Sequence, residues 1–224
     1  MFKQQLNHTV LRKTLEWSYT LAIKGFRGFC SAEELARQYS CLPCSVEKRV
    51  DYLIRRQHVN AGISGLITGI GGVLSVPVGI PANVACVLLL QVRMVAAIAC
   101  IQHKDLSEQG TKSLIFACLA GKNTKNLLSE LGINGSLLLL GYTFRRMPDK
   151  WVNILFRRIS SVLLVNVGTT GAFRLVRLLP LAGSVVGGAL DALSTNTIGQ
   201  VAKEVFSPAD FVQKKATKEL FFYQ

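Results

Sequence analysis

The apolar positions of this chain recur with the spacing of an α-helix over most of its length, and strand-like alternation does not persist. Only the run 162–167 is ambiguous between helix and strand. Glycines, prolines and capping residues divide the helical pattern into separate segments. We therefore predict an all-α protein, a compact helical bundle built around two Gly-rich apolar helical hairpin segments.

The first three predicted helices are amphipathic. One is expected over 3–26, and the pair Ser31 and Glu34 has the spacing of a capping box, which predicts a short helix from there to about residue 39. A charged helix is expected over 45–58, with one apolar face formed by Val46, Val50, Leu53 and Ile54. Later helices are expected over 82–103, 107–121 (capped by Ser107), 124–131, 150–165 and 178–205, and from 207 onward.

The first Gly-rich segment lies in a stretch, 57–92, that contains no Asp, Glu, Lys or Arg. Gly65 and Gly69 are four residues apart, so they would share one stripe of a helix and allow another helix to approach closely. Pro77 and Pro81 interrupt the segment, because proline is costly inside a helix.

The second Gly-rich segment repeats this plan. Small or polar residues recur every four positions, and each segment carries one charge at a similar distance from its last proline, Arg93 in the first and Asp191 in the second. We expect these two charges to meet inside the bundle; the alternative is that each reaches water at a groove. The residues of this core polar pair or groove and the helix-packing glycines are Arg93, Asp191, Thr195, Asn83, Gly65, Gly69, Gly183 and Gly187.

Each apolar segment is long enough to cross a membrane, which takes about 20 residues. Two features argue against a simple span: the prolines divide the first segment, and a charge at the centre of a lipid-facing helix is costly, at ~2.5–3.5 kcal/mol. The positions of Arg93 and Asp191 therefore favour a packed bundle at a membrane surface.

The composition adds a strong basic excess. The chain has 224 residues, with 26 Lys and Arg against 13 Asp and Glu, a formal net charge of +13. Such an excess favours anionic partners. The six cysteines and the lack of a recognisable secretory signal lead us to expect free thiols in a reducing cytosol.

Two basic helical regions are predicted to contact anionic lipid or a protein partner, since cations beside an aromatic anchor suit a phospholipid surface. The alternative is an ordinary solvated helix face, and nucleic acid is disfavoured because the cations flank apolar runs. The predicted contact residues are Arg145, Arg146, Lys150, Trp151, Arg157, Arg158, Lys214, Lys215 and Lys218.

Motifs for catalysis are missing from the sequence. Cys41 and Cys44 have the C-x-x-C spacing, but zinc needs two further ligands and a redox pair is expected to follow a strand, so ordinary turn cysteines are the preferred interpretation. No pattern of a serine hydrolase, a P-loop or a zinc protease is present. We therefore predict no catalytic residue, no metal site and no cofactor.

The Gly-rich block 65–83, the block 91–99 and the blocks at 185–191 and 199–206 resemble the EcsC protein family in content and order. The resemblance spans roughly 45–206. It implies an EcsC-like helical core there, between N-terminal amphipathic helices (1–44) and a C-terminal amphipathic basic helix (207–224). Asn83 stands where the family often has Asp, which argues against a charge-dependent role at that position.

The EcsC family is bacterial, is named after a gene beside an ABC-transporter pair, and has no established activity. The resemblance implies a binding or accessory protein in the bacterial cytoplasm, peripherally associated with the inner membrane and acting with a membrane protein such as a transporter. Two alternatives remain open. One is an enzyme for a lipid or acidic substrate in a groove near Asp191, with Glu130 and His103 as further titratable groups. The other is a helical hairpin that inserts into a bilayer.

Overall fold

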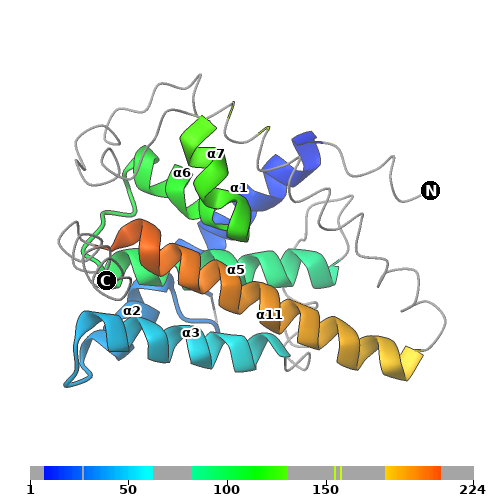
Figure 1. The fold of residues 1–224 in the computed structure, drawn as a ribbon, viewed down its shortest axis with the longest axis horizontal. Coiled ribbons are helices and arrows are strands. Elements are labelled where there is room, and N and C mark those ends of the chain that lie inside the picture. Colours follow the sequence, from blue (N-terminus) through cyan, green and yellow to red (C-terminus); the bar gives the residue numbers. More distant parts are fainter. Residues whose placement is uncertain are drawn as a thin grey trace, which may run out of the picture.

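The computed structural model describes residues 8–26, 28–62, 82–130, 154, 157 and 180–207, with the side chains at 8, 58–62, 82–83 and 180–192 left out (Figure 1). Within these ranges the chain is helical, and its strand-like pairing is limited to a single bridge between Phe26 and Phe29. The prediction of a compact all-α fold is confirmed. Most of the first Gly-rich segment lies outside the described residues, whereas the second is one continuous helix.

In the described ranges the observed helices follow the predicted segments closely. The helices predicted over 150–165 and from 207 onward lie outside the described residues, except for positions 154, 157 and 207. Their bounds are α1 (His8–Lys24), α2 (Ala32–Ser40), α3 (Val46–Gly62), α5 (Ala82–Ile101), α6 (Gln109–Cys118), the 3₁₀ turn η2 (Gly121–Asn123), α7 (Thr124–Glu130) and α11 (Pro180–Phe206).

Helix α5 forms the centre of the bundle. It contacts α1, α2, α3, α6 and α11, and Figure 1 shows α1, α6 and α7 on one side of it, with α2 and α3 on the other. Nearly every side chain from Ala85 to Ala99 is buried. A helix with so few polar residues is stable in water only when neighbours cover most of its surface, as they do here.

In the part of the chain that the structure describes, one helical segment, Val84–Ile101, is long and apolar enough to cross a membrane. That criterion uses length and composition alone, and 83% of the segment is buried inside the protein. The apolar surface of α5 is therefore in contact with other helices of the same chain.

Helices α3 and α11 pack closely in an antiparallel pair. A Cβ atom added to Gly199 would lie 2.8 Å from Cγ1 of Ile54, so this glycine brings the two backbones together. One turn further along, Lys203 of α11 binds Asp51 of α3 with Nζ 2.6 Å from Oδ1. These two contacts fix the register of the pair.

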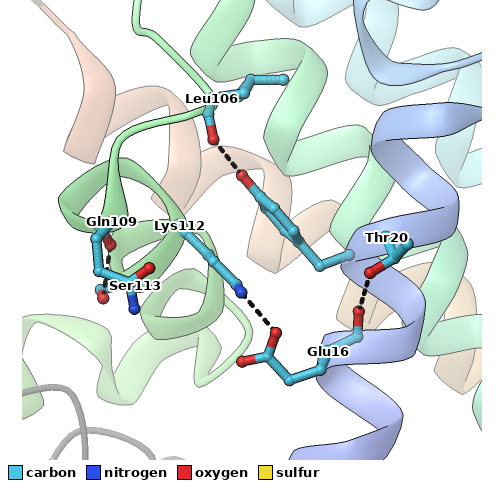
Figure 2. A network of polar contacts seen from close by, with 7 residues as sticks. Glu16, Thr20, Leu106, Gln109, Lys112 and Ser113 are labelled. Atoms are coloured by element: carbon cyan, nitrogen blue, oxygen red, sulfur yellow. Dashed lines mark hydrogen bonds and ion pairs between the residues drawn. The ribbon is translucent and has the colours of Figure 1, made fainter. Parts of the chain in front are cut away.

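Helix α1 is joined to α6 and the chain before it by polar contacts (Figure 2). The Tyr19 hydroxyl donates to the carbonyl of Leu106 at 2.6 Å, and Lys112 forms an ion pair with Glu16. The ammonium of Lys112 also lies 5.0 Å from the centre of the Tyr19 ring. The aliphatic core and this polar contact together hold α1 against the bundle.

The local predictions are confirmed at the start of α2 and wrong at the start of α6. The Ser31 side chain accepts from the amide of Glu34 and the Glu34 carboxylate accepts from the amide of Ser31, which is a complete capping box. Ser107 does not cap α6: its amide and hydroxyl both donate to Asp105, so its side chain stays in the preceding turn. Helix α6 begins after Glu108, which makes no side-chain cap.

Helix α3 buries most of the predicted apolar face. Val50, Leu53 and Ile54 are buried, whereas Val46 is 36% exposed. Val46 is the first residue of the helix, at the end of the face, and the neighbouring helices cover it only partly.

Candidate functional site

The turn between α1 and α2 forms one wall of the site. Phe26 and Phe29 exchange backbone hydrogen bonds of 2.9 and 2.8 Å, and their rings stack with centroids 4.7 Å apart. Gly28 has a φ of +80°, and Gly25, at the end of α1, has a φ of +65°. Left-handed backbone at both glycines allows the chain to reverse within a few residues and to place Phe29 against α5.

Arg93 lies in the middle of α5 and contacts this turn from the inside. Its side chain is only 7% exposed. One terminal nitrogen donates to the carbonyl of Cys30 at 3.3 Å and lies 3.7 Å from its Sγ, and the other donates to Oε1 of Gln57 at 3.3 Å. The guanidinium carbon lies 3.7 Å from the centre of the Phe29 ring. Arg93 therefore connects α5 to the α1–α2 turn and to α3.

The described contacts of this buried cation are with neutral groups. Burial lowers the pKa of Arg93, while Cys30 and Tyr39 act in the opposite direction. An arginine side chain nevertheless keeps its proton in proteins. Among the described residues, its Nε has no hydrogen-bond partner. A carbonyl, an amide oxygen and an aromatic face thus stabilise the charge.

Residues of the same turn line a groove of about 590 Å³. Lys24 and Glu34 give it one charge of each sign, although Glu34 is already engaged in the capping box. The Cys30 thiol is half-buried at its wall. The described residues that line it are Lys24, Gly25, Phe26, Gly28, Phe29, Cys30 and Glu34. The described lining thus combines two stacked aromatic rings with one cation and one carboxylate.

A second polar contact lies on a different side of α5. The amide nitrogen of Gln91 lies 3.1 Å from Oγ of Ser194 and 3.3 Å from Oγ1 of Thr195, both on α11. Gln91 and Thr195 are buried. Because Gln91 and Arg93 are roughly 200° apart around the helix axis, they face different neighbours.

The sequence predicted that Arg93 and Thr195 belong to a core polar site, and both are buried. The structure places them in separate contacts: the described partners of Arg93 are on α3 and the α1–α2 turn, whereas Thr195 binds Gln91. The side chains of Asp191 and Asn83 lie outside the described residues. Pairing of Arg93 with Asp191 stays a prediction.

Most residues predicted to contact lipid are outside the described part of the chain. Arg157 is described, and it is exposed on a helical turn. The others are Arg145, Arg146, Lys150, Trp151, Arg158, Lys214, Lys215 and Lys218.

Among the predicted packing glycines, Gly65 and Gly69 are also outside the described residues. Gly183 and Gly187 lie in α11, and their surroundings are not described. The close helix approach that the structure describes occurs at Gly199, in the same series of four-residue spacings.

Titratable groups do not form a reactive cluster in the described part of the chain. His103 and Glu130 are exposed, and the described residues contain no group of three His, Cys, Asp or Glu that could hold a metal ion. Cys41 is exposed, Cys44 is half-buried, and both are free. The described geometry offers binding surfaces and contains no arrangement of nucleophile and base.

Sequence reasoning missed three partners of the core polar residues, namely Gln57, Gln91 and Phe29. Gln91 and Arg93 lie two residues apart, a spacing that places them on different sides of a helix and therefore against different neighbours. Gln57 follows Leu53 and Ile54 by four and three residues, so it continues the apolar face of α3. This spacing indicates a buried polar side chain, which needs a hydrogen-bond partner. Nothing in the sequence indicated that Phe29 would cover Arg93.

The chain was compared with protein-family models, with curated proteins and with solved structures, and no match was found in any of the three.

Proposed function

We propose that this protein is an accessory protein that binds the anionic surface of a membrane peripherally, from the cytosolic side, and acts through binding. The EcsC-like blocks of the sequence lead us to propose in addition that a membrane protein such as a transporter is its partner there.

The observation that supports the proposal is the separation of apolar surface from charge. The helix with the composition of a membrane span, α5, is covered by its neighbours. The described cations lie outside this core, except Arg93, and exposed cations outnumber exposed carboxylates. The exposed ones are Arg12, Lys13, Lys24, Arg37, Lys48, Arg55, Arg56, Lys104, Lys122, Lys125 and Arg157. Such a surface is attracted to phosphate headgroups without inserting a helix.

Vesicle flotation tests the proposal. The full chain is mixed with vesicles of phosphatidylcholine alone or with added phosphatidylglycerol, at low and at high salt. We expect flotation only with the anionic lipid, and release at high salt, because salt screens attraction between exposed charges. Binding that ignores lipid charge and salt would contradict the electrostatic mechanism. Protease protection of 61–102 after mixing would instead support insertion of the Gly-rich hairpin.

A further inference from the structure

The outward side of α3 combines two cations with one aromatic ring. Lys48, Tyr52 and Arg55 follow one another at spacings of four and three residues, so they form one line along the helix. All three are exposed, and Tyr52 is 53% exposed. The opposite side of the helix is buried in the bundle, at Val50, Leu53, Ile54 and Gln57.

The charges around this line leave it positive. The carboxylate of Asp51 forms an ion pair with Lys203 of α11, whose Nζ lies 2.6 Å from Oδ1, and this cation offsets its negative charge. Arg49 is half-buried and its Nε donates to the Leu42 carbonyl at 3.0 Å, toward the α2–α3 turn. Arg56, exposed beside the line, adds a further cation. Among the residues that the structure describes, no ion pair engages Lys48 or Arg55.

An exposed tyrosine between cations suits the interface of a phospholipid bilayer. Its ring is apolar and its hydroxyl is polar, so the side chain is stable at the boundary between lipid tails and headgroups. Lysine and arginine on the same line would meet lipid phosphates at that depth. Single-stranded nucleic acid would call for several aromatic rings for stacking, and this line has one.

We propose that the α3 basic face, defined as Lys48, Tyr52 and Arg55, is the surface with which this protein lies on an anionic phospholipid bilayer. This proposal rests on the proposed function and adds the orientation: α3 lies parallel to the membrane, with Tyr52 in the headgroup layer and the bundle above it. With 17 residues, α3 would cover about 25 Å of membrane surface.

The test compares two double charge reversals of equal size in the full chain. Lys48→Glu with Arg55→Glu alters the α3 basic face, and Lys104→Glu with Lys122→Glu alters exposed lysines outside α3. Partition onto phosphatidylglycerol-containing vesicles is measured by flotation at low salt. We expect the α3 pair to weaken partition at least tenfold and the control pair to weaken it at most threefold. All four positions are exposed, so both variants should melt cooperatively by circular dichroism.

Tyr52 is tested separately with a matched apolar control. Tyr52→Ala should weaken partition severalfold, whereas Leu193→Ala, which removes an exposed large side chain from α11, should leave it unchanged. Tyr52→Trp provides a direct signal: its extra emission should shift to shorter wavelength on anionic vesicles and be quenched by brominated lipid.

The outcomes separate the two proposals. Failure of the wild-type chain to bind anionic vesicles would overturn both the proposed function and the α3 basic face. Wild-type binding that both double variants reduce equally, with unchanged emission from Tyr52→Trp, would overturn the α3 face alone. Binding of single-stranded RNA that depends on Lys48 and Arg55, without binding to vesicles, would also overturn it.

Discussion

The guanidinium carbon of Arg93 lies 3.7 Å from the centre of the Phe29 ring, so an aromatic side chain from the α1–α2 turn covers a cation in the central helix. The same guanidinium donates to Gln57 of α3. Arg93 thereby connects three parts of the chain that are distant in sequence. The charge of Arg93 would be costly in a helix surrounded by lipid, whereas in this bundle it is stabilised by contacts that join three segments of the chain.

Replacing Arg93 should destabilise the fold. Arg93→Ala leaves the Cys30 carbonyl and the Gln57 amide oxygen without their donor and opens a void, so we expect a loss of about 2–4 kcal/mol in the free energy of unfolding. Arg93→Lys should recover only part of this, since an ammonium cannot reproduce the planar fork. Urea unfolding followed by circular dichroism measures both. An Arg93→Ala variant within about 0.5 kcal/mol of wild type would contradict the assigned role.

Two double-mutant cycles distinguish the observed partner of Arg93 from the predicted one. Combining Arg93→Ala with Gln57→Ala should give a coupling energy of about 1 kcal/mol, because one hydrogen bond is counted in both single variants. The cycle with Asp191→Ala tests the pairing expected from the sequence. Strictly additive effects there would eliminate that pair.

A methyl group at Gly199 should be poorly tolerated. It would lie 2.8 and 2.9 Å from two carbons of Ile54, a buried β-branched side chain with little room to rotate. We expect Gly199→Ala to cost about 1–3 kcal/mol despite the better helix propensity of alanine. Gln200→Ala, at the next and exposed position, is the control and should change the unfolding midpoint little. Combining Gly199→Ala with Ile54→Ala should cost less than the sum of the two single effects.

The capping box should make α2 sensitive to acid. Ser31→Ala removes the acceptor for the Glu34 amide and should cost about 1 kcal/mol. The hydrogen bonds from the backbone and side chain of Ser31 lower the pKa of Glu34 below 4.5. Because the pKa of Glu34 is lower in the folded state, its ionised carboxylate stabilises the fold above pH 4.5. This stabilisation is lost as the pH falls below 4.5. The difference in melting temperature between wild type and Glu34→Gln should therefore become smaller in acid. A difference that does not depend on pH would argue against the capping role.

High pH should weaken the packing around α5 and α1. Burial raises the pKa of the Cys100 thiol from 9.0 to about 11 and the pKa of the Tyr19 hydroxyl above its ordinary 10.0. Because the folded state holds these protons more tightly, the protonated groups add to the free energy of unfolding. This contribution is complete below pH 9 and is lost as the pH rises toward 11. Urea midpoints across this range should fall for wild type.

Two variants test which groups cause this loss. The urea midpoint of Cys100→Ala should fall less steeply with rising pH, because the titrating thiol is gone. Tyr19→Phe should be less stable by about 1 kcal/mol at neutral pH, since it loses the bond to Leu106, and should also show a flatter pH dependence. Identical slopes in all three proteins would show that neither group is responsible.

The sequence by itself determined the helical class, the approximate helix ends and the capping box at Ser31. These depend on residues within a few positions of one another, through the 3.6-residue period and the local hydrogen bonds of caps. The start of α6 was missed because Ser107 had a competing acceptor, Asp105, two residues away.

Only the tertiary structure decided which neighbour each polar core residue meets. Apart from Asn83, Gln91 and Arg93, helix α5 is apolar all round, so its length and composition alone do not show whether lipid or protein surrounds it. Packing turned Gln91 toward α11 and Arg93 toward Gln57 and Phe29, and it left Lys48, Tyr52 and Arg55 outside. These contacts join segments that are more than a hundred residues apart in the case of Gln91 and Thr195, and a local pattern does not encode them.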